Sequence, residues 1–183
     1  INASTIVCLG PADELAEALA TRLRAIAPRQ LDDPQAQLSA FANPLMADYI
    51  DAQIEDGLKV SGAEELTAGG SPRRCELSGS VFMRPTVVRC DDFTHPLSNR
   101  EFLFPYVAVV ESCRESVLQE IGPSLAVSAI TEDPSLIESL VNCAQIDRLN
   151  IGSIPTNRVE WDQPHEGNLF EFLYRRRAIQ RAG

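Results

Sequence analysis

The sequence predicts an α/β fold in which a mainly parallel sheet is flanked by helices. Short apolar runs alternate along the chain with stretches in which apolar residues recur at helical spacing, and glycine or proline separates many of them. Hydrophobic residues make up 44% of the 183 residues, which is enough for one compact domain with a sizeable core. Repeated alternation of strand and helix is typical of a parallel sheet whose crossover helices cover its faces.

The first sixty residues predict one strand and two helices. Residues 5–9 form a continuous run of apolar and β-branched side chains, which favours a strand buried on both faces. Leucine and isoleucine then recur at helical spacing over residues 12–27, with acids near the start and arginines near the end, as the helix dipole favours. A second apolar stripe, which includes Met46 and Tyr49, predicts a helix over about residues 45–56. Gly57 is expected to close this helix in the left-handed conformation.

The middle of the chain predicts a loop followed by strands. Residues 63–80 carry several glycines, a proline and many charges, so we expect an irregular surface connection there. Two apolar runs flank Pro85, and because proline cannot donate to a strand ladder, the strand is expected to lie at an edge or to break at this residue. Residues 106–110 predict a further strand.

The last third continues the alternation. Residues 115–121 predict a short helix that stops at Gly122-Pro123, and residues 125–131 predict a strand. Asp133 caps a helix expected over residues 134–145, because proline follows it at the first helical position and an apolar stripe comes after. A short strand over 149–151 and a last helix that begins near Asn168 complete the prediction.

Charge and cysteine content exclude several classes of function. The 16 Lys and Arg residues against 26 Asp and Glu give a net charge of −10, which repels phosphate backbones, so no nucleic-acid partner is expected. The apolar runs are far shorter than the ~20 residues that cross a bilayer, so no membrane partner is expected either. Five cysteines without a Cys-x-x-Cys pair or a histidine at metal-ligand spacing indicate free thiols in a reducing cytoplasm and no metal site. Because the chain begins with Ile1 and not with methionine, we expect it to be cut from a longer protein.

Three stretches taken in order carry a resemblance to a known family. They are Gly69-Gly70 with the later Pro85-Thr86-Val87, then the segment 96–105 (PLSNREFLFP) with the strand after it, and then the segment 125–133 (LAVSAITED). This order resembles the carboxy-terminal catalytic domain of the aldehyde dehydrogenase superfamily. The resemblance covers residues 1–152 as a fragment of that domain, and residues 153–183 form a divergent carboxy-terminal loop and helix.

The resemblance implies an NAD(P)-dependent oxidation of an aldehyde to a carboxylic acid. In the family a cysteine thiolate attacks the aldehyde, hydride passes to the nicotinamide ring, and water activated by a carboxylate hydrolyses the thioester. Residues 1–5 resemble those that follow the nucleophile, so the cysteine would precede Ile1, and the general base and dinucleotide fold would lie further upstream. The sequence has no G-x-G-x-x-G motif, so we expect no catalytic residue in this chain and no activity from it alone.

Two residues are expected at the cofactor, NAD or NADP. Glu101 stands where the second glutamate of the family's Glu-Glu-x-Phe-Gly-Pro motif binds the nicotinamide ribose, and Leu103 stands where phenylalanine lines the nicotinamide pocket. Arg100 replaces the first glutamate of the motif, and Phe104 replaces its glycine. The competing interpretation of Glu101 is a loop carboxylate that lies in solvent or pairs with Arg100.

Trp161 and His165 are the residues that the resemblance places at the substrate funnel, where they would face the aldehyde. The alternative is that Trp161 covers core surface and His165 is a solvated loop residue. Among the cysteines Cys113, beside Arg114, has the best setting for a nucleophile, but no histidine stands near it in the sequence. The runner-up function is a non-catalytic scaffold or pseudoenzyme of the same fold, and in either case we expect the parent protein to form homo-oligomers.

Overall fold

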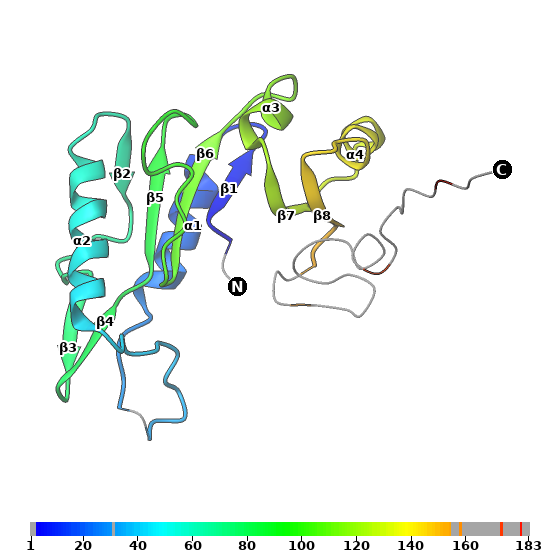
Figure 1. Cartoon of the computed structure of the whole chain (residues 1–183). Helices are drawn as coiled ribbons and strands as arrows, with labels where there is room; N and C mark the ends of the chain where they lie inside the picture. The colour runs from blue at the N-terminus through cyan, green and yellow to red at the C-terminus, as the bar shows by residue number, and fades with distance from the viewer. Residues whose placement is uncertain (1–2, 31, 155–157, 159–172, 174–179, 181–183) are drawn as a thin grey trace. The chain divides into compact units, whose positions relative to one another are not determined.

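The structure is a computed structural model, and it describes residues 3–30, 32–154, 158, 173 and 180. The chain divides into two compact units, one within residues 2–113 and one that begins at Arg114. Each unit has its own strands and helices (Figure 1). Trp161 and His165, and all but one residue of the predicted last helix, lie outside the described residues. The predicted boundary between residues 152 and 153 therefore stays a prediction.

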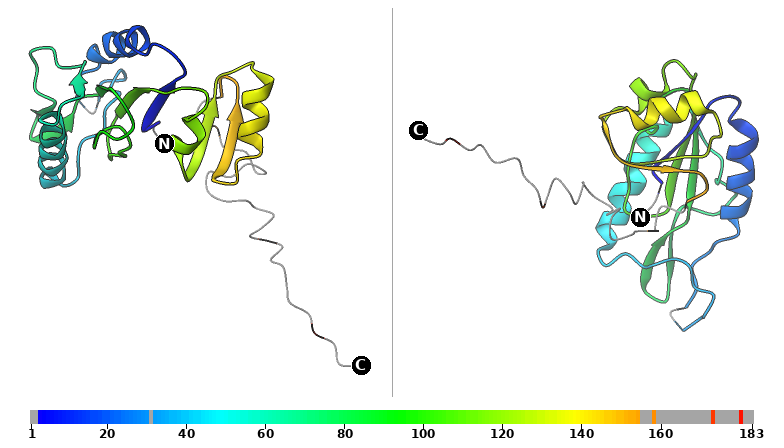
Figure 2. Two further views of the ribbon diagram at one scale, coloured as in Figure 1. Left: turned by 90° about the horizontal axis from the view of Figure 1, so that it is seen from above. Right: turned by 90° about the vertical axis from the view of Figure 1, so that its right-hand side faces the viewer.

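A four-stranded sheet forms the centre of the first unit. Its order is β1 (Thr5–Cys8), β6 (Tyr106–Glu111), β5 (Thr86–Cys90) and β2 (Ala63–Glu65). β1 and β5 both pair with β6 in parallel, whereas the short β2 pairs with β5 in the antiparallel sense. The helices α1 (Asp13–Arg24) and α2 (Pro44–Leu58) cover opposite faces of this sheet (Figure 2). The predicted α/β class with mainly parallel strands is confirmed.

The sheet separates two apolar cores because successive residues of a strand point to opposite faces. Even-numbered residues of β5 and β6 face α2, and odd-numbered apolar residues of both strands face α1. On the α1 side, alanines at every fourth position of the helix region are fully buried, so this helix approaches the strands closely: Ala12, Ala16 and Ala20. On the α2 side the helix contributes Ala47, Ile50 and Ile54.

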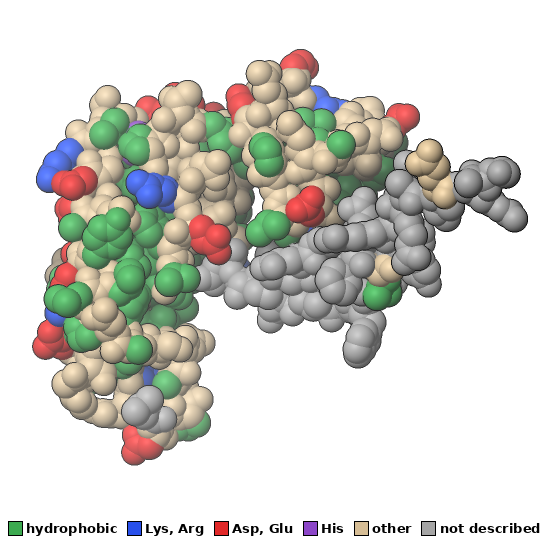
Figure 3. Space-filling view, viewed as in Figure 1, with side chains coloured by type: hydrophobic (Ala, Val, Ile, Leu, Met, Phe, Trp, Pro, Cys, Tyr) green, Lys and Arg blue, Asp and Glu red, His purple; other side chains and the backbone are tan. Residues whose placement is uncertain are grey.

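The outward face of α2 differs from the prediction. Met46 and Tyr49 belong to the predicted apolar stripe, yet their side chains are 41% and 59% exposed, and Leu45 beside them is 73% exposed. Figure 3 shows apolar side chains gathered on the viewed face over this helix. Only the Ala47, Ile50 and Ile54 side of the stripe enters the core, so the apolar surface of α2 is wider than its buried face.

The conformation of Gly57 and the position of β1 also differ from the prediction. Gly57 lies inside the last turn of α2 and is not among the glycines with positive φ, so it does not end the helix by a left-handed turn. Glycine is required here because the Leu97 side chain packs against it, and a Cβ atom at this position would lie 2.5 Å from Cγ of Leu97. β1 forms where predicted, but it lies at the edge of the sheet and its residues are half-buried, not buried on both faces.

The predicted loop over residues 63–80 contains two strands. Besides β2, it holds β3 (Arg74–Leu77), which pairs with β4 (Ser80–Met83) as an antiparallel hairpin. Ser78 and Gly79 form the two-residue turn with φ of 52° and 78°, and positive φ at both positions suits the twist of a hairpin. The predicted break at Pro85 is confirmed, because β4 ends before it and β5 begins after it in another sheet.

A buried arginine joins α2 to the β2 and β3 region. The Arg73 side chain is only 4% exposed, and its guanidinium contacts the carboxylates of Asp51, Glu55 and Glu65. Pairing with these carboxylates raises the pKa of Arg73 although burial alone lowers it. Several carboxylates around one guanidinium compensate its desolvation, so we interpret the cluster as structural.

The second unit contains a parallel strand pair with a crossover helix. After α3 (Val117–Ile121) come β7 (Ser124–Ala129), α4 (Pro134–Val141) and β8 (Ile146–Ile151), and β7 pairs with β8 in parallel. The Asp133 carboxylate accepts from the Ser135 backbone N–H at 2.9 Å, which confirms the predicted cap of α4. Hydrogen bonds from Ser135, together with Arg114 nearby, lower the pKa of Asp133. α4 ends at Val141, four residues earlier than predicted, because the chain turns there to enter β8.

Within the part of the chain that the structure describes, no helix combines the length and the hydropathy that a membrane span requires.

Candidate functional site

The candidate site lies at the edge of the sheet where β1, β5 and β6 begin, which we call the amino edge. These strands are parallel, so their first residues lie together along one side of the sheet. The Ala108 N–H donates to the Ser4 carbonyl at 3.0 Å, and the Thr86 N–H donates to the Pro105 carbonyl at 2.9 Å. The Thr5 hydroxyl donates to the Ser98 carbonyl at 2.8 Å. The first described residues of the chain and the segment 98–105 therefore border the same edge.

The segment before β6 alternates between solvent and core. Glu101 and Leu103 are exposed, Leu103 by 79%, whereas Phe102 and Phe104 are buried. The Phe102 ring meets Tyr106 edge to face at a centroid distance of 4.8 Å, and Phe104 lies 6.1 Å from the same ring. Such aromatic contacts stabilise beyond the area that they bury. The buried rings thus anchor the segment, and Glu101 and Leu103 lie on its solvent side.

The Glu101 carboxylate has no hydrogen-bond or ion-pair partner among residues 3–30 and 32–154. The pairing with Arg100 that the sequence left open does not form. Arg100 instead lines a shallow groove of about 290 Å³ beside the end of α2, together with Gln53, Asp56, Gly57, Val60, Pro96 and Leu97. Both oxygens of Glu101 are therefore available to hydroxyl donors.

Phe104 replaces the glycine of the family motif, but its side chain does not lie on the solvent side of the segment. Its side chain is only 4% exposed and packs in the α2-side core. Tyr106 anchors the same core, because its hydroxyl donates to the Leu97 carbonyl at 2.7 Å. Burial is the largest cause that raises the pKa of Tyr106, so the phenol stays protonated at physiological pH.

Two of the described cysteines, Cys8 and Cys90, have raised pKa values, which disfavours the thiolate that a nucleophile needs. The Cys90 Sγ lies 3.7 Å from Nδ1 of His95, a neighbour that the sequence analysis missed although the two residues are five positions apart. Burial raises the pKa of Cys90 to about 11, so this group is a thiol and not a thiolate at neutral pH. Burial also raises the pKa of Cys8. Cys113 is exposed, but it precedes α3 by four residues and does not open that helix.

Within the described ranges, no three His, Cys, Asp or Glu side chains come together in a group that could hold a metal ion.

Comparison of the sequence with family models and with curated proteins finds no match. Comparison of the structure with solved structures does find similar folds. Betaine aldehyde dehydrogenase from Staphylococcus aureus matches 83% of this chain with a TM-score of 0.69 and 21% identity. PnpE, solved in complex with nicotinamide adenine dinucleotide, matches 91% with a TM-score of 0.74 and 19% identity. An aldehyde dehydrogenase from Bacillus cereus matches 83% with a TM-score of 0.68 and 18% identity.

The match covers only 31% to 34% of each of these three solved chains, so this chain spans about a third of their length. At identities of 18% to 21% the likeness establishes the fold and leaves the chemistry to be argued from the site. The chain has the fold of part of an aldehyde dehydrogenase, as its motifs indicated.

Proposed function

We propose that this chain is part of an oxidoreductase that oxidises an aldehyde to a carboxylic acid with NAD or NADP. The fold supports the proposal, and one observation carries it. Glu101 offers an exposed carboxylate without a partner among the described residues, next to the exposed Leu103, at the amino edge. A free carboxylate beside an apolar side chain suits a ribose attached to a flat nicotinamide ring.

In this function Glu101 accepts hydrogen bonds from two adjacent ribose hydroxyls, and Leu103 contacts the nicotinamide face. When bound, the cofactor accepts the hydride that leaves the substrate. The buried Phe102 and Phe104 keep the two binding residues from turning inward. Trp161 and His165, outside the described residues, are the proposed contacts for the aldehyde.

The remaining chemistry belongs to segments outside these 183 residues. By the resemblance, the family's nucleophilic cysteine, its general base and its dinucleotide fold all correspond to positions upstream of Ile1. We therefore propose that the isolated chain is inactive and that the complete protein is a cytoplasmic homo-oligomer.

The test is to express the complete protein and the 183-residue chain side by side and to follow NADH or NADPH formation with a panel of aldehydes. We expect turnover from the complete protein, loss of turnover when the residue before Ile1 is changed from cysteine to serine, and none from the chain alone. Turnover by the chain alone, or a complete protein that reduces neither cofactor with any aldehyde, would contradict the proposal.

A non-catalytic scaffold is the second candidate, and the motif itself favours it. Arg100, Leu103 and Phe104 all differ from the residues that the family motif has at these positions. The residue that precedes Ile1 in the complete protein distinguishes the two functions. Cysteine there, behind a dinucleotide-binding fold, supports the enzyme, and any other residue supports the scaffold.

A further inference from the structure

Thr5 joins two segments of the amino edge that are 93 positions apart in the sequence. Its hydroxyl donates to the Ser98 carbonyl at 2.8 Å. Val7, two residues further along β1, packs against the α2-side core, so the Thr5 side chain points to the same face of the sheet. Ala108 is its register partner on β6 and is fully buried in that core. Because Ala108 is small, it leaves room on this face for the bond between Thr5 and the loop.

The residue that accepts this bond is itself held firmly. Ser98 is fully buried. Its hydroxyl lies 2.7 Å from the carbonyls of both Phe93 and His95, and its N–H donates to the His95 carbonyl at 3.0 Å. These bonds close a compact turn over residues 93–98. The Ser98 carbonyl is therefore a buried acceptor at the end of a fixed turn, and the Thr5 hydroxyl is the described donor that reaches it.

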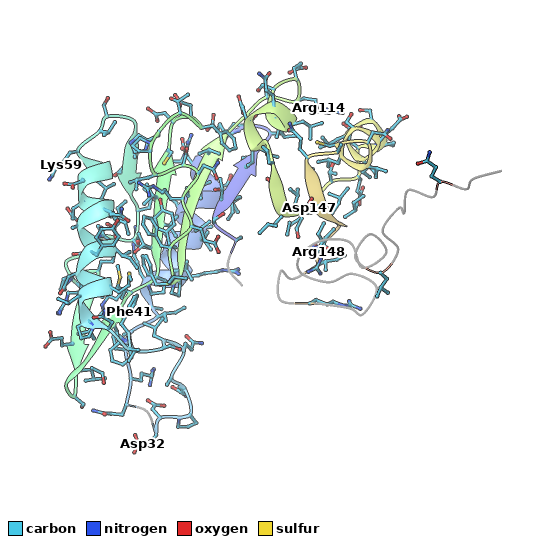
Figure 4. The ribbon with its side chains drawn as sticks, viewed as in Figure 1. Asp32, Phe41, Lys59, Arg114, Asp147 and Arg148 are labelled. Carbon is cyan, nitrogen blue, oxygen red and sulfur yellow. The ribbon has the colours of Figure 1, made fainter. Side chains whose placement is uncertain are left out.

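Two neighbouring strands hold two consecutive carbonyls of this loop through side-chain hydroxyls. Tyr106 on β6 donates to the Leu97 carbonyl at 2.7 Å, and Thr5 on β1 donates to the next carbonyl, that of Ser98. The Leu97 side chain is 2% exposed, and the α2-side core to which it belongs also receives Phe41, which Figure 4 labels. The loop is thus attached to both strands just before the segment that carries the candidate cofactor contacts.

The link lies between the two parts of the amino edge that the proposed function uses. Glu101 follows Ser98 by three residues, and Ile1 precedes Thr5 by four. In the proposed function the nucleophilic cysteine comes before Ile1, and Glu101 holds the ribose of the cofactor. The separation between the attacking sulfur and the nicotinamide ring then depends on how Thr5 holds Ser98. A displacement of about 1 Å between reacting groups lowers a rate by up to about a hundredfold.

We propose that Thr5 is a positioning residue, which holds the start of β1 and the segment 98–105 at a fixed separation across the amino edge. Thr5 acts through the Ser98 carbonyl and does not itself touch the reacting groups. The link between the two segments follows from the hydrogen bond alone. Its effect on hydride transfer rests on the proposed function. A purely structural bond would change the stability of the chain and leave the hydride-transfer step as it is.

Three variants test the link. Thr5→Val keeps the branched shape of the side chain but cannot donate, so the buried Ser98 carbonyl loses its partner. Thr5→Ser keeps the hydroxyl and should restore the link. Thr67→Val is the matched control, because the Thr67 hydroxyl oxygen accepts from the Val87 N–H at 3.1 Å, 20 positions away. Val87 belongs to the α1-side core, so this variant removes a hydrogen bond between distant residues without touching the segment 98–105.

The first measurement is NMR of the 183-residue chain. We expect Thr5→Val to move the carbonyl carbon signal of Ser98 and the amide signals of residues 99–101. Thr5→Ser and Thr67→Val should move these signals far less. Unchanged signals in Thr5→Val would overturn the link, whatever the function of the protein.

If Thr5→Val does not fold, the unmodified chain decides. The link requires a Thr5 hydroxyl proton that exchanges slowly with water and shows a nuclear Overhauser contact to the amide of residue 99. Absence of this contact would overturn the link.

The second measurement uses the complete protein, with an aldehyde that carries deuterium on the carbon that gives up the hydride. We expect Thr5→Val to lower kcat by about tenfold or more, with a full primary deuterium isotope effect on the remaining turnover, because hydride transfer becomes the slow step. Thr5→Ser and Thr67→Val should keep the kcat of the unmodified protein. An unchanged kcat in Thr5→Val, or a lower kcat without an isotope effect, would refute the positioning role.

The two measurements separate the positioning role from the proposed function. Turnover by the unmodified protein together with an unchanged kcat in Thr5→Val would refute the role of Thr5 and leave the proposed function intact. Absence of turnover in the unmodified protein would refute the proposed function, and the NMR signals of residues 98–101 would then decide the link on their own.

Discussion

At the scale of single residues, the loop before β6 depends on a few close contacts. Leu97 fills the gap at Gly57 with its side chain, bonds His95 through its N–H and binds Tyr106 through its carbonyl. The sequence predicted Glu101 and Leu103 as cofactor contacts from the motif, and these roles remain predictions. It gave no such indication for His95, because a single histidine in a loop has no periodicity, and its contact with Cys90 depends on how the loop folds back.

Replacement of Gly57 by alanine should destabilise the chain. The added Cβ would lie within 2.5 to 2.8 Å of three carbon atoms of the Leu97 side chain, which is 2% exposed, so this side chain would have to shift. Overpacking of this kind costs about 1–3 kcal/mol. Urea unfolding should show this loss, whereas Gly69→Ala, with nothing closer than 3.7 Å and no positive φ, should lose far less. Equal losses would refute the close contact.

Thiol chemistry should distinguish the described cysteines. Since burial raises the pKa of Cys90 to about 11, its thiol should not react with iodoacetamide in the folded chain at pH 8, whereas the exposed Cys113 should. Mass spectrometry of the labelled protein reads this directly, and labelling in urea is the control in which all five cysteines react. Rapid labelling of Cys90 in the folded chain would contradict its buried contact with His95.

At the scale of elements, the sequence predicts long or strongly patterned segments better than short ones. The strand and helix of residues 5–24, α2, β6 and the β7–α4–β8 unit form near the expected positions, although α4 and β8 differ from the prediction by three or four residues at one end. Each of these segments has a periodic apolar face or a clear cap. β2 and β3 were missed because they are three and four residues long and highly charged. β2 pairs with β5, which comes later in the chain, and β3 pairs with β4. The residues of β2 alone therefore give no local signal that they form a strand.

The hairpin turn offers a test at this scale. The backbone of Ser78 has a φ of 52°. Asparagine adopts this positive φ readily, whereas residues branched at Cβ, such as valine, adopt it at a cost. Ser78→Asn should raise the free energy of unfolding by about 0.5 kcal/mol, and Ser78→Val should lower it by about 1 kcal/mol. Thermal unfolding of the two variants checks the opposite signs. Stabilisation by valine would show that the turn does not have this conformation.

At the scale of the whole molecule, parallel pairing explains why residues distant in sequence form one candidate site. The start of β1 and the segment before β6 are about a hundred positions apart, yet both border the amino edge, since Thr5 pairs in register with Ala108. A motif can indicate which residues matter, but it does not show which of them are exposed. That depends on the aromatic core, which buries Phe102 and Phe104 and leaves Glu101 in solvent.

The most direct measurement is the KM for NAD or NADP of the complete protein with Glu101→Gln, beside a matched variant, Glu14→Gln. Glu14 is also exposed but lies on α1, after the opposite end of β1. A charged hydrogen-bonding partner is worth about 1.5–3 kcal/mol, so Glu101→Gln should raise KM by about tenfold or more, and Glu14→Gln should leave it unchanged. Equal KM values for the two variants would show that the amino edge does not bind the cofactor.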